Sequence, residues 1–283
     1  LVPSGLAGDF PMLDVFKTLD MVVNGETTLE LSDSGRFLAA KGRFDLEGGQ
    51  ITPPWDPDSP LRIDRGQLNL RYQKSDDVLE IEPSSLDWGQ SKLVFSGEFR
   101  PVRDSAGVPT AWNFAMRADE AVLAVEEAGL APVKVDEWQI AGRIEPKPGR
   151  VTLSRFAIRA GKASIALSGD IAQTPGAEEV HLAGEISPMP VDMLKRFWPK
   201  FLAGKARGWS LERVTGGEVL GGRFSVNLGP GDFANLKSGG EISPEAVGVE
   251  LDFVGMAIAY IAGLPPVSTG TAKLSVSGVE FAV

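Results

Sequence analysis

The residues that could support catalysis are few in this chain. Its one histidine, His181, lies in the alternating segment Val-His-Leu-Ala-Gly. A strand there would direct it to the face opposite Val180 and Leu182. A catalytic triad or a histidine metal site would depend on this single residue. The sequence therefore favours an ordinary strand histidine.

Two pairs of adjacent acids, Glu126-Glu127 and Glu178-Glu179, are the other candidates for catalysis. Glycoside hydrolysis needs two carboxylates that face each other across a cleft. Neighbours on a strand point to opposite faces, so neither doublet forms such a pair by itself, although carboxylates distant in sequence could still meet. No nucleophile elbow, Walker loop or dinucleotide fingerprint is present, and there are no cysteines. We predict a protein that is not an enzyme and needs neither cofactor nor metal.

Basic and aromatic residues gather between residues 187 and 212 of an otherwise acidic chain. The net charge is −10, which argues against a nucleic-acid partner. The local cluster could contact lipid headgroups or a membrane interface. It could equally form a helix pair with solvated charges and aromatics packed on a sheet, which we favour. The residues concerned are Lys195, Arg196, Trp198, Lys200, Lys205, Arg207 and Trp209.

The elements that would position these residues are mostly strands. Apolar alternation that ends at or near a glycine recurs at Leu93–Phe99, Ile165–Ile171, Val180–Ile186 and Leu274–Val279. Alternation with a period of two is typical of a strand with one buried face. The 33 glycines and 20 prolines are spread along the chain, which favours many short strands over long helices.

Helical spacing is confined to a short insert near 190–210. The segment Val191–Trp198 has the apolar spacing of a helix and prolines at both ends, and a second helix is predicted from Pro199 to about Trp209. A strand pattern resumes at Gly217–Leu228, and a further short helix is a candidate at Met12–Leu19.

An internal repeat organises much of the chain. Moving Leu61–Phe99 by 72 residues places it on Val133–Ile171 without a gap, with apolar positions matching in strand-like register. Weaker echoes occur at Phe37–Ile51 and Thr269–Val283. The identical pairs are Asp64/Asp136, Gln67/Gln139, Arg71/Arg143, Gly89/Gly161, Ser96/Ser168 and Gly97/Gly169. We favour stacked antiparallel units over a single β-sandwich with accidental self-similarity.

These patterns predict a mainly β chain in three segments. Residues 1–186 would hold the repeated antiparallel units, 187–212 the helical insert, and 213–283 a further β unit that continues the same sheet. No run reaches the roughly 18 apolar residues that a membrane span needs. We expect a fragment or mature form whose targeting or anchoring segment lies elsewhere.

Several motifs after the insert occur in a recognisable order. They are Trp198-Pro199, Ala206-Arg207-Gly208-Trp209, Gly216-Gly217-Glu218-Val219, Leu264-Pro265 and the alternating strand Ala272–Gly278. Over about residues 193–283 this order resembles the central region of YhdP-like members of the AsmA-like family. The upstream repeats resemble the generic strand units of that family. The chain departs from the pattern in its short connection Gly229–Phe233 and in lacking the family's N-terminal transmembrane helix.

The resemblance implies an elongated sheet that curls into an open, taco-like groove with an apolar inner face. Such proteins are anchored in the inner membrane of two-membrane bacteria, extend through the periplasm and help move phospholipid toward the outer membrane. The implied partners of this chain are therefore phospholipid, the membrane through segments outside the chain, and other envelope proteins.

A groove of this kind would need no catalytic chemistry. Each CH₂ group removed from water contributes about 0.8 kcal/mol, so an acyl chain can bind without a specific site. The same side chains could instead fill a closed sandwich core. The candidate lining residues are Leu93, Phe95, Phe99, Ile165, Leu167, Ile171, Leu274 and Val276.

Two other function classes compete with lipid binding. A structural or protein-interaction module of the envelope would have a closed core and no bound lipid. A carbohydrate-binding module or hydrolase would need an exposed aromatic platform, from Trp55, Trp88 or Trp112, and facing carboxylates for hydrolysis.

Overall fold

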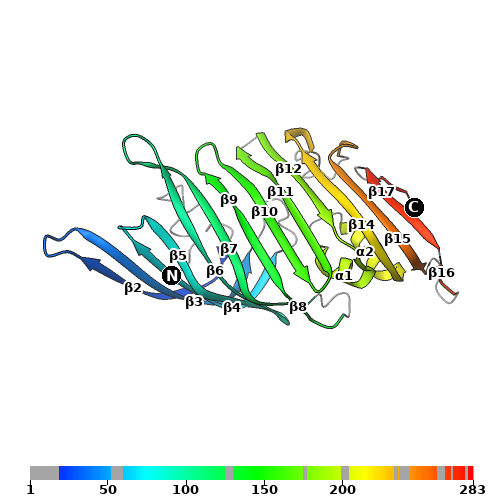
Figure 1. Cartoon of the computed structure of the whole chain (residues 1–283), viewed down its shortest axis with the longest axis horizontal. Coiled ribbons are helices and arrows are strands. Elements are labelled where there is room, and N and C mark those ends of the chain that lie inside the picture. The colour runs from blue at the N-terminus through cyan, green and yellow to red at the C-terminus, as the bar shows by residue number, and fades with distance from the viewer. Residues whose placement is uncertain are drawn as a thin grey trace. The chain divides into compact units, whose positions relative to one another are not determined.

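The computed structural model is mainly β and confirms the predicted fold class. Its strands pair into one large antiparallel sheet, and no pairing among the described residues closes that sheet (Figure 1). The described residues are 19–51, 60–124, 130–174, 177–198, 204–232, 235, 242–259, 265–268, 270–277 and 280–282. Two compact units share the chain: residues 1–126 with 131–146, and residues 127–130 with 147–283.

The first unit is a meander in which successive strands are antiparallel neighbours. From β2 to β7 each strand pairs with the next, β7 pairs with both β8 and β9, and β1 pairs with the end of β3. The bounds are β1 Leu19–Asp20, β2 Val23–Leu31, β3 Phe37–Ile51, β4 Leu61–Gln73, β5 Val78–Trp88, β6 Ser91–Arg103, β7 Pro109–Leu123, β8 Val133–Val135 and β9 Glu137–Glu145.

The second unit continues this pattern around a helical insert. The pairing runs β10, β11, β12, β14, β15, β17, β18, while the short β13 and β16 pair with β14 and β15. The bounds are β10 Arg150–Ala160, β11 Ala163–Thr174, β12 Ala177–Ile186, β13 Met189–Pro190, α1 Val191–Phe197, α2 Gly204–Arg213, β14 Val214–Leu228, β15 Val247–Ile258, β16 Val267–Ser268, β17 Thr271–Ser277 and β18 Glu280–Ala282.

The two copies of the repeat fold alike in detail. β5 and β10 begin and end 72 residues apart, and β6 and β11 begin 72 residues apart. The turns between these strands place Gly89 and Gly161 at φ of 53° and 60°, a conformation that glycine adopts without steric cost. The bulge between Ile81 and Ser84 also recurs between Leu153 and Phe156. The repeat therefore specifies turns and bulges as well as strands.

The first unit has one apolar face and one polar face. Residues that are register partners in an antiparallel pair point to the same side, so rows of side chains can be followed across the strands. Phe99 and Phe114 stack within one such row, with ring centroids 5.8 Å apart. Two rows of the apolar face are Leu46, Gly66, Leu86, Leu93, Ala121 and Val135, and Ala40, Tyr72, Leu79, Phe99, Phe114 and Gly142.

A polar cluster fixes the turn between β4 and β5. Asp77 has φ of 49°, and its carboxylate accepts bonds from Nε and Nη2 of Arg103, both at 2.7 Å, and from Oη of Tyr72 at 2.9 Å. The hydrogen bonds from Arg103 hold the pKa of Asp77 below its usual value. This cluster ties the turn to the far end of β6.

The helical insert lies near its predicted position. Helix α1 spans Val191–Phe197, as predicted, whereas α2 ends at Arg213 instead of about Trp209. β14 begins at Val214, directly after α2, which is earlier than the predicted Gly217. The candidate helix at Met12–Leu19 lies outside the described residues, apart from Leu19 in β1.

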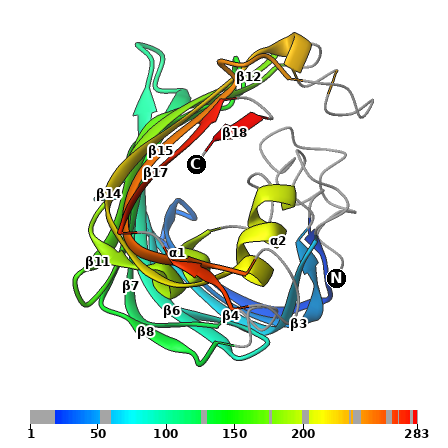
Figure 2. The ribbon, with the colours of Figure 1, turned by 90° about the vertical axis from the view of Figure 1, so that its right-hand side faces the viewer.

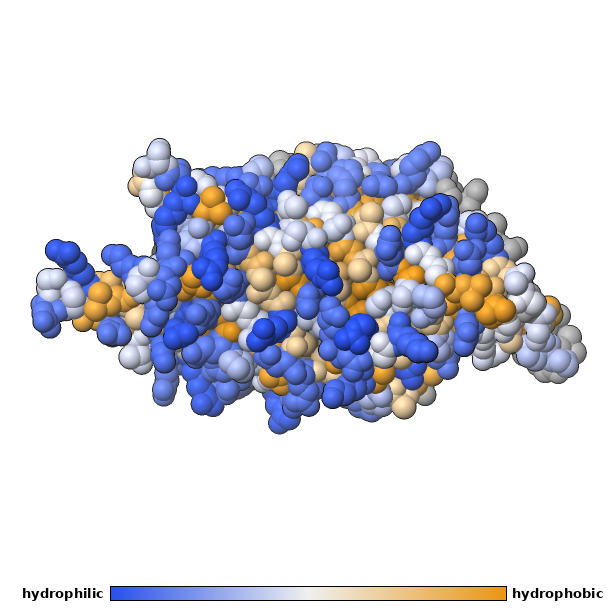
Figure 3. All heavy atoms as spheres, in the orientation of Figure 1, coloured by the Kyte–Doolittle hydropathy of each residue, from blue (hydrophilic) through white to orange (hydrophobic). Residues whose placement is uncertain are grey.

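The strands of the second unit bend, so their sheet has a concave face. Figure 2 shows α1 and α2 on the concave side of β14 and β15, and both helices contact β14. α1 buries Val191, Leu194 and Phe197. Figure 3 shows the opposite, convex side, where mostly hydrophilic side chains surround smaller apolar areas.

Candidate functional site: the apolar face of the second unit

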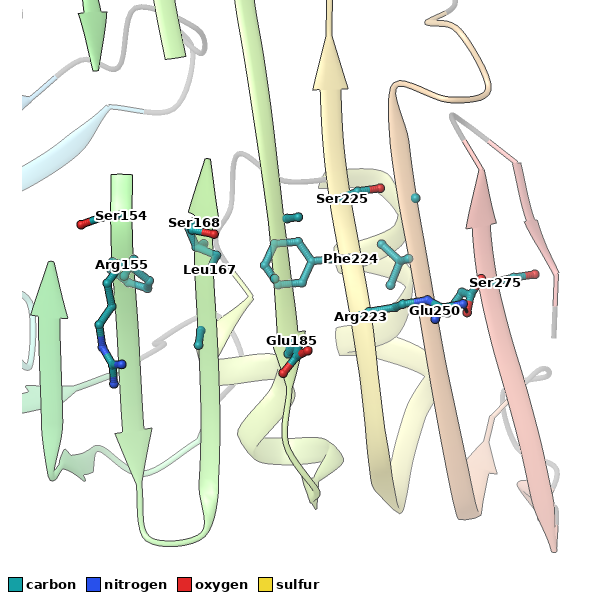
Figure 4. Close-up of a pocket in the computed structure, with 16 residues that line it drawn as sticks. Ser154, Arg155, Leu167, Ser168, Glu185, Arg223, Phe224, Ser225, Glu250 and Ser275 are labelled. Atoms are coloured by element: carbon teal, nitrogen blue, oxygen red, sulfur yellow. Dashed lines mark ion pairs between the residues drawn. The ribbon is translucent and has the colours of Figure 1, made fainter. Parts of the chain in front are cut away.

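One row of apolar residues crosses five strands of the second unit. Register pairing joins Phe156 to Leu167, Leu167 to Gly184, Gly184 to Phe224, and Phe224 to Val249. All five residues are half-buried. Figure 4 shows Leu167 and Phe224 on strands either side of β12. We call Phe156, Leu167, Gly184, Phe224 and Val249 the central row.

Phe224 depends on a glycine in the neighbouring strand. A Cβ atom at Gly184 would lie 2.5 Å from Cζ of Phe224 and 2.6 Å from the carbonyl oxygen of Ala166. The phenyl ring therefore lies over the bare backbone of β12. Such close packing of an aromatic ring on a strand glycine keeps the central row continuous at a position without a side chain.

The rows on either side of the central row are also apolar. Because the side chains of a strand alternate, positions two residues away share its face. On one side these are Ile158, Ile165, Ile186, Gly222, Leu251 and Leu274. On the other side they are Leu153, Gly169, Leu182, Val226 and Val247. The apolar face thus runs uninterrupted by charge through three rows.

Exposure differs between the two ends of this face. Toward the helices the residues are buried: Val219 is 0% exposed, Leu251 2% and Phe253 4%. Since α1 and α2 contact β14 from the concave side, this buried end identifies the apolar face as the concave one. We call Ile165, Ile186, Val219, Leu251 and Phe253 the covered end. Away from it, Leu182 and Leu228 are half-buried, whereas Val226 and Val247 are buried.

The predicted lining residues fall into two sets, each on a single face. Leu93, Phe95 and Phe99 alternate along β6 on the apolar face of the first unit. Ile165, Leu167 and Ile171 do so along β11, and Leu274 lies on the same face at β17 by register, while Val276 pairs with Val249 and its side chain lies outside the described residues. Phe95 and Ile165 are buried, while Leu93, Phe99, Leu167, Ile171 and Leu274 are half-buried.

Sequence reasoning predicted a strand at Gly217–Leu228 but did not choose lining residues on β14 and β15. Phe224 and Val226 of β14, and Val249 and Leu251 of β15, alternate with Arg223, Ser225 and Glu250 as clearly as the residues chosen on β11. The alternation in these segments indicates a strand with one apolar face, but neither segment belongs to the 72-residue repeat from which most of the lining residues were chosen.

The predicted headgroup residues are mostly turned inward. Lys195 and Arg207 are only 7% and 8% exposed, and both donate to backbone carbonyl oxygens. Arg196 Nη1 donates to the carbonyl oxygen of Asp192 at 3.2 Å. Trp198 and Trp209 are half-buried, Lys200 lies outside the described residues, and so does the side chain of Lys205. The insert is a helix pair that contacts the sheet, but Lys195 and Arg207 are buried and not solvated as that interpretation expected.

Burial gives Lys195 an unusual titration. Desolvation lowers its pKa below 10.5, and the nearby Asp192 carboxylate opposes the shift in part. The folded state therefore releases this proton at a lower pH than the unfolded chain does. The contribution of the Lys195 amine to the free energy of unfolding should therefore increase as the pH rises from the pKa of Lys195 in the folded state toward 10.5. We expect the free energy of unfolding of wild type, minus that of Lys195→Met, to be larger at pH 10 than at pH 8 when both are measured by urea denaturation. A difference that is constant with pH would contradict this.

A shallow hollow of about 860 Å³ lies on the same strands. It is lined by the five residues of the central row and by the polar rows on either side of them, whereas Ile165, Ile186 and Leu251 of the apolar face do not line it. The hollow therefore opens on the convex, polar face (Figure 4). An ion pair lines the hollow: Arg223 Nη2 lies 2.6 Å from Glu250 Oε2, and both side chains are exposed to solvent. Surface pairs of this kind contribute little to stability.

The remaining chemical candidates do not assemble into a site. His181 lies on the exposed polar face, where its Nδ1 is 3.5 Å from Oδ1 of Asn227, its register partner. No three His, Asp or Glu side chains of the described residues cluster to hold a metal ion. None of the described helices is long and apolar enough to cross a membrane.

Comparisons with family models, curated proteins and solved structures found no match. The site is therefore interpreted from its geometry alone.

The tryptophans considered for a sugar-binding platform are dispersed. Trp88 and Trp112 are both half-buried in the first unit, and they pair with Ser91 and Pro101 of β6. Ten residues along a strand separate those partners by about 33 Å. These two tryptophans cannot form a joint platform, and Trp55 lies outside the described residues.

Proposed function

We propose that this chain binds the acyl chains of phospholipid along its apolar sheet faces. In this proposal it is a periplasmic segment of an inner-membrane-anchored, AsmA-like protein that helps move lipid toward the outer membrane. The observation that carries the proposal is the central row, which is continuous across five strands, free of charge and only half-buried.

The energetics of the face support acyl-chain binding. A side-chain core is normally closed on both sides, whereas the central row retains exposed surface that a ligand can dehydrate. Each CH₂ group buried there contributes about 0.8 kcal/mol, so ten groups would contribute roughly 8 kcal/mol before the costs of ordering. The charged groups of the sheet, among them Arg223 and Glu250, lie on the opposite face, where they leave the acyl path dry.

Native mass spectrometry of the purified chain, combined with lipid extraction of the same sample, tests this function. We expect phospholipid at a defined stoichiometry in protein never exposed to detergent. A clean apo mass, with no lipid gained after incubation with phosphatidylglycerol vesicles, would overturn the proposal. That result would favour a structural or protein-interaction module of the envelope.

A further inference from the structure

The helical insert lies on the same apolar face that the central row crosses. Ile165, Ile186 and Leu251 of the covered end lie two residues from the central row on the same strands, and Val219 pairs with Phe253 one step further along, so the two sets form one apolar surface. Helix α1, which contacts β14 from this side, buries Val191, Leu194 and Phe197. Side chains of the chain itself thus fill the place that an acyl chain would take.

Two buried cations hold the helices by a reciprocal clamp. Lys195 of α1 donates from Nζ to the carbonyl oxygens of Leu211, near the end of α2, and Val214, the first residue of β14. Arg207 of α2 donates from Nε to the carbonyl oxygen of Trp198, the C-cap of α1, at 3.0 Å. Each helix therefore supplies a cation that donates to a backbone carbonyl near the C-terminal end of the other, where positive charge is favoured.

The clamp matters because α2 offers little apolar surface of its own. Its sequence, GKARGWSLER, contains two glycines and four charged residues. Arg213 at the end of α2 is bonded to Ala259, which follows β15: its Nη1 donates to the carbonyl oxygen of Ala259 at 3.4 Å, and the N–H of Ala259 donates to its carbonyl oxygen at 2.7 Å. Polar bonds to backbone carbonyls thus help to fix α2 on the face.

We propose that the α1–α2 insert is an autoinhibitory plug, which Lys195 and Arg207 hold on the apolar face in place of an acyl chain. This inference rests on the proposed function and adds to it a limit on where the acyl chain can lie. In the clamped state an acyl chain occupies the central row and stops at α1. Release of the insert opens the covered end as additional binding surface.

The double variant Lys195→Met, Arg207→Met tests the plug, because methionine keeps most of the side-chain bulk and removes the donors. Two measurements are needed: backbone hydrogen exchange over residues 191–213, and the stoichiometry of cis-parinaric acid, a fluorescent fatty acid. We expect at least tenfold faster exchange in both helices and more probe bound per chain. The matched control is Arg223→Met, Lys273→Met, on the polar face, which should change neither.

The outcomes separate the plug from the function on which it rests. Faster exchange with unchanged probe stoichiometry, or unchanged exchange, would overturn the plug while leaving wild-type acyl binding intact. A wild type that binds no probe, beside a variant that does, would support complete inhibition by the plug. No binding by either protein would refute the proposed function and the plug together. If the double variant does not fold, Arg207→Met alone is measured in the same way.

Discussion

Replacing Leu167 with asparagine is expected to weaken cis-parinaric acid binding by a factor of about 5 to 140. Leu167 is the centre of the row that joins Phe156 to Gly184, and its side chain is half-buried on the concave face. An amide there must lose water without gaining a partner when an acyl chain covers it, which costs about 1–3 kcal/mol. Each 1.4 kcal/mol corresponds to a factor of ten in affinity.

The neighbouring residue provides the matched control for this experiment. Ser168 is exposed on the opposite face of the same strand, so Ser168→Asn places the same side chain one position away without touching the apolar row. Its binding should equal that of wild type. Circular dichroism melting confirms that both variants fold. Equal binding by Leu167→Asn and Ser168→Asn would show that the probe does not use this face.

The alternation of apolar residues was enough to predict the strands and the side of each strand that faces inward. On β6 and β11 the choice of Leu93, Phe95, Ile165 and Leu167 followed from the period of two, and the register places each set on one face. Local pattern decides these features because a strand with one dry face permits only one orientation of its side chains.

The roles of the insert could not be predicted in the same way. Lys195 and Arg207 were assigned to a solvent-facing cluster because charged side chains are seldom buried. Their burial depends on carbonyl groups of Leu211, Val214 and Trp198, which become available only at helix ends and strand starts. Residue types do not specify that geometry, so the sequence left both the exposed and the packed interpretation open.

The glycine shared by the two repeat copies at positions 97 and 169 has a physical explanation that the sequence alone did not supply. Gly97 and Gly169 both lie where the next strand approaches closely. A Cβ atom at Gly97 would lie 2.5 Å from the carbonyl oxygen of Ala115, and one at Gly169 would lie 1.9 Å from that of His181. Backbone proximity thus accounts for the recurring glycine.

Gly169→Ala is expected to be the most destabilising single methyl addition in the second unit. Gly169 has φ of +148°, which L-residues rarely adopt, and its new Cβ would overlap the backbone of β12 at His181. Backbone strain costs about 1–3 kcal/mol and forced repacking about 1–3 kcal/mol more. A loss of about 3 kcal/mol or more should lower the melting temperature by roughly 6–12 °C for a unit of this size.

Comparison with Gly161→Ala separates the steric clash at Gly169 from the cost of the positive φ angle. Gly161 also has positive φ, at +60°, but no atom lies within 4 Å of its added Cβ. Only the left-handed penalty of about 1–2 kcal/mol applies there. Thermal melts of the two variants should therefore differ, with Gly169→Ala the less stable. Equal melting temperatures would mean that β11 and β12 can separate at Gly169 without cost. The register that carries Leu167 onto Gly184, and with it the central row, would then be less firmly fixed than the pairing of these strands indicates.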